Sequence, residues 1–330
     1  MKRHRTWMTI GAAFALLLSV AACGAGTTSD DDVDADGLTE VNLTVLPITN
    51  VAPVQIAIDQ GFFADQGLEV KVSYATTGAA IVPGVLNGSV DIGYSNLPAE
   101  ILASSEGLPL VSIATSDGPA ASATEDTNAL VVRANDDIDD AADLNGRTVA
   151  VNALGGLIYL ITRASADNLG GDSSSYEFVE IPFPDMLGAL QDGRIDAASI
   201  TEPFLTTALD SGDFTRLFNT GSLGGQQPEL IFDTYFTSEE TLGAKPGLID
   251  GFRAAMYEAN AYASENPGDA RAAVGKYTET DPAVLKKMTL PIWADAALSQ
   301  DDFESIVSLM QKYGLLDSDK IPSYADLIRE

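Results

Sequence analysis

The chain has 330 residues, with 18 Lys and Arg against 48 Asp and Glu, which gives a formal net charge of −30. A chain this acidic repels nucleic acid, so no nucleic-acid partner is expected. Its one cysteine, Cys23, excludes a disulfide within the chain, and its one histidine, His4, lies in the N-terminal leader. A Ser-His-Asp triad, a Cys-His pair and the usual zinc sites are therefore excluded, and we expect no metal and no cofactor.

The leader predicts secretion. Three basic residues precede an apolar run over residues 8–22, which is too short to span a bilayer, and small residues stand just before Cys23. This pattern resembles a bacterial lipoprotein signal. It implies cleavage after residue 22, lipidation of Cys23 and anchoring at the outer face of the cell membrane. A simple cleaved signal with an incidental cysteine is the alternative.

Residues 23–37 are predicted to be a disordered acidic tether. They contain five aspartates and almost no large apolar side chain, so they cannot bury enough surface to fold. As a flexible coil the segment spans roughly 20 Å. The leader carries three cations, so the processed chain has a net charge of −30 − 3 = −33.

The first folded elements are predicted from hydrophobic patterns. Alternating apolar residues indicate a strand over 41–45, a helical pattern covers 53–60 and stops at Gly61, and a second strand covers 68–74. The polar loop after the first strand contains the candidate ligand-binding residues Thr49 and Asn50.

The stretch 76–100 is predicted to form half of a binding cleft. A polar turn opens an apolar helix over 79–86, and a strand over 90–94 leads to a polar pair before Pro98. Helix N-termini preceded by such residues offer free N–H groups to an anionic or polar ligand. An ordinary α/β connection is the alternative. The candidate residues are Thr76, Thr77, Gly78, Ser95 and Asn96.

A second set of elements follows. Strands are predicted over 108–114 and 148–151, and the apolar run 129–132 is where we expect the chain to change lobe. A glycine-bearing loop then precedes a helix over 157–169, whose N-terminus is unobstructed. Its candidate binding residues are Asn152, Gly155 and Gly156.

The second half repeats the pattern of the first. Residues 86–91 (LNGSVD) match residues 190–196 (LQDGRID) in having a helix end, a glycine, a polar residue, an apolar residue and an aspartate. In each copy a strand and a polar pair then precede a proline, and in the second copy the pair contains Glu202. Chance is an alternative, because glycine-terminated helices that feed strands are common in α/β proteins.

The C-terminal part is predicted to be helical. A strand over 230–236 returns the chain to the first lobe, and no later strand is expected. We expect an α/β fold of two lobes, each a mixed sheet flanked by helices, that close by hinges near 129–133 and 230–236. Lobe 1 comprises residues 38–130 and 231–330, and lobe 2 comprises residues 131–230. Helices are expected over 238–242, 246–264, 267–276, 282–288 and 301–313, packed on lobe 1.

Four segments carry a family likeness. Residues 61–70, 86–93, 143–151 and 192–204 resemble the nitrate/sulfonate/taurine and pyrimidine-precursor group of solute-binding proteins. The resemblance implies the type II periplasmic-binding-protein fold, a monomer without enzymatic activity, and delivery of a small ligand to an ABC transporter permease with its cytoplasmic ATPase. Relatives that make a pyrimidine by consuming their own histidine are excluded, because His4 lies in the leader.

The ligand is the least determined feature. The candidate loops contain no Lys or Arg, so an anion would be held by N–H groups, hydroxyls and amides at helix N-termini. Phe183, Tyr235 and Tyr94 or Phe204 are candidates to flank the ligand, and Glu202 to accept from an N–H group. We expect an alkylsulfonate or taurine. A pyrimidine or another nitrogen heterocycle, related to thiamine or riboflavin, is the runner-up, and nitrate or a neutral solute remains open.

Two other classes of function are weaker. A hydrolase would have to use a carboxylate pair such as Glu100 and Glu202. An adhesin would present an exposed apolar patch and no small-molecule pocket.

Overall fold

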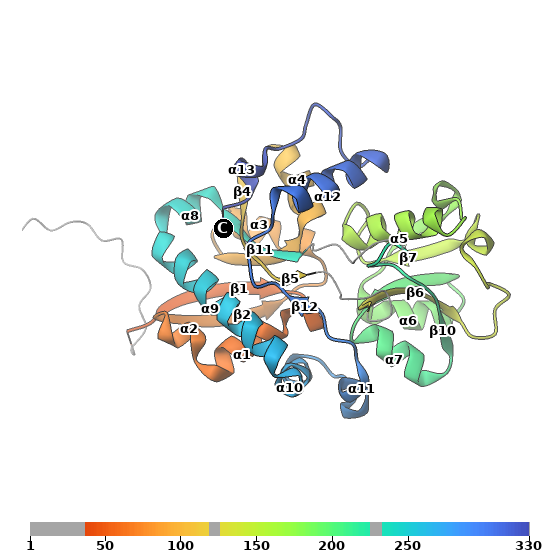
Figure 1. Cartoon of the computed structure of the whole chain (residues 1–330), viewed down its shortest axis with the longest axis horizontal. Coiled ribbons are helices and arrows are strands. Elements are labelled where there is room, and N and C mark those ends of the chain that lie inside the picture. Colours follow the sequence, from red (N-terminus) through yellow and green to blue (C-terminus); the bar gives the residue numbers. More distant parts are fainter. Residues whose placement is uncertain (1–36, 119–125, 225–232, 330) are drawn as a thin grey trace, which may run out of the picture. The chain divides into compact units, whose positions relative to one another are not determined.

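The computed structural model describes residues 37–118, 126–224 and 233–329. These residues form two five-stranded sheets, each covered by helices (Figure 1). The predicted signal peptide, Cys23 and nearly all of the tether lie outside the described residues. Within the described ranges, no helix combines the length and the apolar character that a membrane span requires.

The first sheet belongs to lobe 1 and has the strand order β2-β1-β3-β11-β4. β1 pairs in parallel with β2 and β3, whereas β11 runs antiparallel to β3 and β4. β3 begins later than predicted, because the Val90 N–H still bonds the Gly84 carbonyl in a turn. The strands are β1 (Thr39–Val45), β2 (Leu68–Tyr74), β3 (Ile92–Asn96), β4 (Leu110–Thr115) and β11 (Asp233–Ser238).

The second sheet belongs to lobe 2 and has the order β8-β7-β9-β6-β10, with the same pattern of parallel and antiparallel pairs. The edge strands β8 and β10 were not predicted, since their side chains are largely half-buried or exposed and show little apolar alternation. The expected lobe boundary at residue 130 falls inside β6. The strands are β6 (Asn128–Arg133), β7 (Thr148–Val151), β8 (Glu177–Glu180), β9 (Ala197–Thr201) and β10 (Phe214–Asn219).

The helices begin and end close to the predicted signals. Gly61 ends the first α-helix in the left-handed conformation, with φ 83°. The single helix predicted over 79–86 is instead a short 3-10 turn followed by a short α-helix. The helices of this part are η1 (Thr49–Val51), α1 (Ala52–Gln60), α2 (Phe62–Asp65), η2 (Gly78–Ala80), α3 (Val82–Leu86), α4 (Leu97–Ser105), η4 (Ala141–Leu144), α5 (Leu157–Asn168), η5 (Ser173–Ser175), α6 (Phe183–Gln191) and α7 (Phe204–Ser211).

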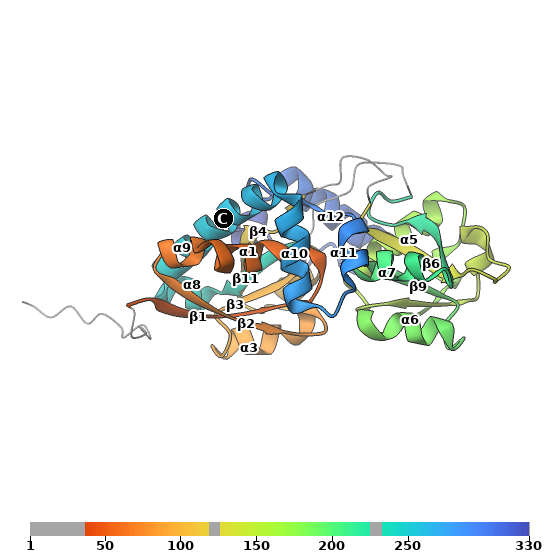
Figure 2. The ribbon, with the colours of Figure 1, turned by 90° about the horizontal axis from the view of Figure 1, so that it is seen from below.

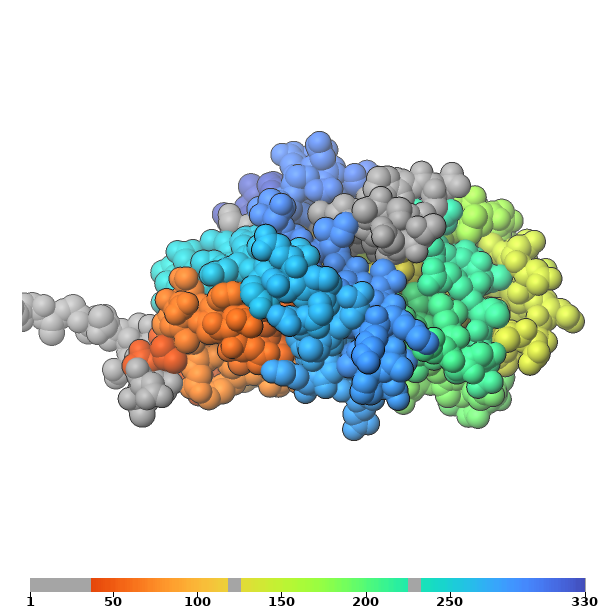
Figure 3. All heavy atoms as spheres, turned by 60° about the horizontal axis from the view of Figure 1, so that its bottom comes forward, coloured from red at the N-terminus to blue at the C-terminus, as the bar shows by residue number. Residues whose placement is uncertain are grey.

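The C-terminal part corrects two expectations. It contains a strand, β12 (Ile292–Trp293), which pairs with β5 (Asp117–Gly118). It also contacts both lobes, since α11 packs between α10 and α7 (Figure 2), and Figure 3 shows this blue segment against the green surface of lobe 2. The helices are α8 (Glu239–Ala244), α9 (Pro246–Glu265), α10 (Pro267–Tyr277), α11 (Pro282–Lys287), α12 (Gln300–Lys312) and α13 (Tyr324–Leu327).

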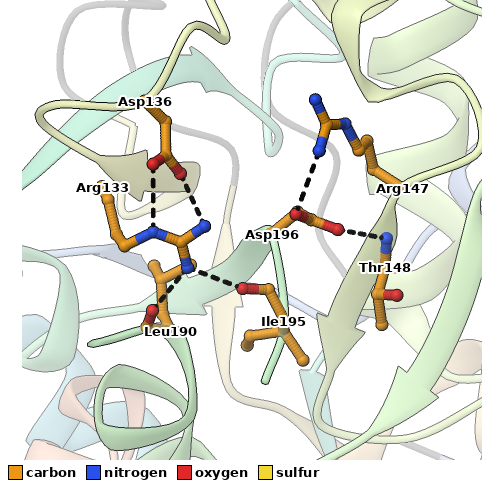
Figure 4. A network of polar contacts seen from close by, with 7 residues as sticks. All are labelled: Arg133, Asp136, Arg147, Thr148, Leu190, Ile195 and Asp196. Atoms are coloured by element: carbon orange, nitrogen blue, oxygen red, sulfur yellow. Dashed lines mark hydrogen bonds and ion pairs between the residues drawn. The ribbon is translucent and has the colours of Figure 1, made fainter. Parts of the chain in front are cut away.

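The repeated sequence motif has the same structural role in both sheets. In lobe 1, Asp91 accepts a hydrogen bond from the Asn42 N–H at 2.8 Å and contacts Lys245 at 3.1 Å. In lobe 2, Asp196 accepts from the Thr148 N–H at 2.9 Å and contacts Arg147 at 3.5 Å (Figure 4). Each aspartate thus fastens its own strand to the middle one of the three parallel strands, at Asn42 of β1 and at Thr148 of β7.

In lobe 2, a set of polar contacts made by Arg133 lies next to this aspartate. Arg133 forms a two-point ion pair with Asp136 and donates to the carbonyls of Leu190 and Ile195 at 2.6 and 2.8 Å (Figure 4). Leu190 lies in the last turn of α6, and Ile195 lies in the loop that leads to β9. Charge-assisted bonds from one guanidinium to both carbonyls hold the end of this helix against that loop.

An aromatic stack fixes the part of the lobe 1 core that lies next to the cleft. Tyr235 is fully buried and packs edge-to-face on Tyr94 and Phe252, with ring centroids 5.4 and 5.3 Å apart. Edge-to-face contacts of this kind hold ring orientation as well as burying area. The Tyr94 hydroxyl is therefore aimed from the core toward the strand ends.

Candidate functional site

A pocket lies where the carboxyl ends of the parallel strands of both lobes meet. Residues at or just beyond the C-terminal ends of β1, β3, β7 and β9 line it, which is the usual position of ligands in open α/β sheets. The volume that water-sized molecules can occupy within it is about 50 Å³. The lining residues include Leu46, Ile48, Asn50, Gly78, Tyr94, Ser95, Asn96, Asp117, Thr127, Asn128, Asn152, Leu157, Ile158, Ile161, Phe183, Thr201, Asp233 and Pro291.

Hydrogen-bond acceptors gather at the lobe 1 wall of this pocket. The Asn50 side-chain amide donates to Asp117 and also to Asp233, the latter at 3.2 Å. The Tyr94 hydroxyl donates to Asp233 at 2.8 Å. The indole N–H of Trp293 donates to the Asn50 carbonyl at 2.9 Å, so β12 fixes the backbone of Asn50.

This acceptor wall can accept a further hydrogen bond. Asn50 Oδ1 is buried and has no hydrogen-bond partner among the residues that the structure describes. Burial raises the pKa of Asp233 to about 7, while the hydrogen bond from Tyr94 acts in the opposite direction. Two carboxylates this close, with none of the lining residues being Lys or Arg, make a site that favours a donor or a cation.

Besides Tyr94, which was named as an alternative to Phe204, six of the residues predicted from the sequence line this pocket. They come from both lobes and from five separate segments of the chain, which the fold brings together. Their roles in ligand binding remain a prediction. The six residues are Asn50, Gly78, Ser95, Asn96, Asn152 and Phe183.

Two further predicted residues, Gly155 and Gly156, line an adjoining apolar hollow. The hollow lies between α4 of lobe 1 and the loop after β7 of lobe 2, and it shares Gly78, Ser95 and Asn96 with the pocket. A Cβ atom on Gly156 would stand 3.7 Å from the Asn96 amide nitrogen. The glycine loop therefore passes close to Asn96.

The predicted turn residues before α3 are not among the residues that line the pocket. Thr77 accepts a hydrogen bond from the Ala80 N–H and caps η2, and Thr76 precedes it in the chain. The Thr77 side chain thus serves the turn, as the alternative of an ordinary α/β connection would have it.

Three predicted residues are buried beside the pocket. Tyr235 lies in the core, and Thr49 is buried, with its N–H bonded to the Glu202 carbonyl at 3.2 Å. The Glu202 carboxylate accepts from the N–H and hydroxyl of Thr206 and from the Thr289 N–H. Both carboxylate oxygens of Glu202 therefore have partners within the protein, and burial raises the pKa of this group.

The structure does not bring the possible catalytic carboxylates to one pocket. Glu100 is buried in α4, lines the adjoining hollow and accepts from the Thr234 hydroxyl, whereas Glu202 lies at the start of α7 in lobe 2. Among the described residues there is also no cluster of three or more His, Cys, Asp or Glu side chains suited to hold a metal ion.

The sequence reasoning missed the two most polar residues of the pocket. Asp233 is a lone acid at the start of β11, and Asp117 lies two residues after the end of the apolar strand β4. An acid at the end of a buried strand is a usable signal, because it points to the edge where ligands bind.

The comparisons with known proteins agree with this geometry. Residues 48–270 match the family described as "NMT1/THI5 like". The chain is 30% identical over 182 residues to a formylaminopyrimidine-binding protein of Halalkalibacterium halodurans, covering 55% of this chain and 52% of the relative. It therefore spans about half the length of that relative. It is 25% identical over 228 residues to a taurine-binding periplasmic protein of Escherichia coli, covering 69% of this chain and 68% of the relative.

A solved structure shows the same fold. The alkanesulfonate-binding protein SsuA of Xanthomonas axonopodis pv. citri, bound to MOPS, superposes with a TM-score of 0.74 at 14% identity, covering 88% of this chain and 98% of that one. The two lobes with mixed sheets are thus those of a periplasmic-binding-protein-like fold, as predicted. Since the family match covers most of the chain, this protein belongs to the NMT1/THI5-like family.

Proposed function

We propose that the chain is an extracytoplasmic solute-binding protein of an ABC importer, and that its ligand is a small nitrogen heterocycle with amino groups, such as an aminopyrimidine. The observation that carries the proposal is the acceptor wall of Asn50, Asp117 and Asp233. Amino groups on an aromatic ring donate hydrogen bonds, and a protonated ring carries positive charge, so both match carboxylates and an amide oxygen.

The lobe 2 lining of the pocket suits the body of such a ligand. Leu157, Ile158 and Phe183 of lobe 2 also line the pocket and provide apolar surface for a flat ring. Burying apolar area contributes roughly 25 cal/mol per Å². The Halalkalibacterium relative, a formylaminopyrimidine-binding protein, supports the same class of ligand.

An organic sulfonate, which the sequence favoured, is the second candidate. The taurine-binding relative of Escherichia coli supports it. Against it stand Asp117 and Asp233, which would repel a sulfonate across a short distance, and the lack of Lys or Arg among the lining residues. We therefore place the heterocycle first.

Calorimetric titration of the protein decides between these ligands. The test panel is 4-aminopyrimidine, its 5-aminomethyl and N-formyl derivatives, taurine, methanesulfonate and nitrate. We expect stoichiometric binding of an aminopyrimidine, without turnover, and stabilisation of about 2.7 kcal/mol at 100 times the dissociation constant. Binding of taurine or methanesulfonate but of no aminopyrimidine would make the sulfonate the first candidate ligand. Turnover of a bound compound would show that the protein is an enzyme and would contradict the proposed binding function.

The proposal includes the partners expected from the sequence. A monomer anchored through lipidated Cys23 would hand its ligand to a permease driven by a cytoplasmic ATPase. Cys23→Ala is expected to release the protein from the membrane fraction without changing ligand affinity, because the tether separates the anchor from the fold. Retention of the variant in the membrane would refute lipidation at this position.

A further inference from the structure

Asn96 lies at the N-termini of two helices that belong to different lobes. Its Oδ1 atom accepts a hydrogen bond from the Ala99 N–H of its own helix, α4, at 3.1 Å. The same atom accepts from the Leu157 N–H, the first N–H of α5 in lobe 2, at 3.2 Å. One side-chain oxygen thus bridges the cleft.

The bridge occupies a position that an anion would otherwise favour. α5 is a twelve-residue helix whose N-cap, Gly156, offers no side chain, so its first N–H groups need an external acceptor. Two converging helix N-termini favour negative charge. The oxygen of Asn96 supplies a neutral acceptor at this position.

The internal repeat contains a counterpart of this bridge. Asn96, the last residue of β3, reaches the helix after β7 of the other lobe. Glu202, the residue after β9, reaches the turn after β1 of the other lobe, because its carbonyl accepts from the Thr49 N–H at 3.2 Å. Both lobes therefore place an oxygen near the end of a strand within reach of the other lobe, although the two residues are one position apart in the aligned repeat. At Asn96 the bridging atom is a side-chain oxygen, which a substitution can remove.

We infer that Asn96 is a positioning residue that holds the cleft closed in place of an anionic ligand group, so that an uncharged or cationic ligand can be enclosed. This inference rests on the proposed function for the ligand class. The bridge itself is formed by protein atoms alone. Asn96 Oδ1 links the two lobes. It accepts from the first N–H group of α5, and this bond does not require a charged group on the ligand.

The test combines removal of the oxygen with chemical rescue. Asn96→Gly removes the side chain, and glycine is itself tolerated at an N-cap. Asn96→Asp keeps an oxygen within reach of both helices. The matched control is Asn87→Gly, because Asn87 is exposed and, among the residues that the structure describes, its side chain accepts only a local bond, from the Ser89 N–H at 3.0 Å.

The first measurement is thermal unfolding of the protein without ligand. We expect Asn96→Gly to lower the melting temperature by a few degrees and sodium formate to restore part of that loss, because formate can accept from both N–H groups. Sodium chloride at equal ionic strength should not restore it. Formate should leave the parent chain, Asn96→Asp and Asn87→Gly unchanged relative to chloride. Equal responses of Asn96→Gly and Asn87→Gly to formate would overturn the inference.

The second measurement is the rate of ligand release, with an N-formyl-aminopyrimidine as the probe. A net hydrogen bond corresponds to a change of about threefold to tenfold, and we expect release from Asn96→Gly to be faster by this factor. Asn96→Asp should release the probe at nearly the parent rate. An unchanged release rate from Asn96→Gly would show that Asn96 does not hold the cleft closed around the ligand, and it would leave the proposed ligand class unaffected. Failure of the parent chain to bind any aminopyrimidine would instead overturn the proposed function, and the formate experiment would still decide the inference.

Discussion

The two lobes share one architecture but present different chemistry to the pocket. Their sheets have the same strand order and the same pattern of pairing, and a matching aspartate fastens each sheet at the same place. Yet both carboxylates that line the pocket, Asp117 and Asp233, belong to segments paired with lobe 1. The lobe 2 residues that line it are uncharged. The difference suggests that lobe 1 selects the ligand by polar contacts and lobe 2 mainly covers it.

Two separate substitutions, one of a polar residue in lobe 1 and one of an apolar residue in lobe 2, test whether lobe 1 selects the ligand. We expect Asp233→Asn to weaken aminopyrimidine binding by about ten- to a hundredfold, because a hydrogen bond to a charged group contributes about 1.5–3 kcal/mol. Phe183→Leu keeps an apolar wall and should cost less than about fivefold. Calorimetric titration measures both.

Asp137→Asn serves as the control for the first exchange. Asp137 is exposed in the loop after β6 and does not line the pocket, so its amide variant should bind like the parent chain. A larger loss for Phe183→Leu than for Asp233→Asn would contradict the assignment of selectivity to lobe 1.

The matching aspartates should differ in their contribution to stability. The Asp91 side chain is 8% exposed, whereas that of Asp196 is 25% exposed and its cation lies further away. We expect Asp91→Asn to lower the free energy of unfolding by about 2 kcal/mol and Asp196→Asn by about 1 kcal/mol or less. Urea unfolding gives both values. Equal losses would mean that burial does not distinguish the two copies.

The raised pKa of Asp233 predicts a pH dependence of stability. Its folded pKa of about 7 lies above the usual value of 3.8, so between these values the folded state holds a proton that the unfolded state has released. Stability from this group is therefore present at low pH and lost as the pH rises through 7, by about 1 kcal/mol between pH 6 and 8. Asp233→Asn should remove this loss. An unchanged pH profile in the variant would show that Asp233 does not titrate there.

The sequence predicted the elements whose signals are local. β7 was predicted with its observed bounds, Gly61 ends α1, and Asn96 caps α4 as the polar pair before Pro98 indicated. The six predicted residues that line the pocket lie at strand ends or helix starts, which short patterns reveal.

The missed features depend on contacts between distant segments. Asp117 reaches the pocket because β5 pairs with β12, and the two-residue strand β12 has no pattern of its own. Glu202 looked like a ligand acceptor, but Thr206 and Thr289 already donate to it, and Thr289 lies in a part of the chain that was expected on the other lobe. No local signal shows that a polar group is already satisfied.

The smallest expected effect concerns the contact between the C-terminal part and lobe 2. Lys287 of α11 contacts Asp210 of α7 at 2.6 Å, but its side chain is 60% exposed and that of Asp210 is 31% exposed. Exposed ion pairs contribute little, because solvent screens them and two side chains lose freedom. Lys287→Ala should therefore lower the free energy of unfolding by less than about 0.5 kcal/mol, a change that 0.5 M salt should abolish. A loss above 1 kcal/mol in urea unfolding would show that α11 fastens the two lobes through this pair, and that lobe 2 depends on lobe 1 for its stability.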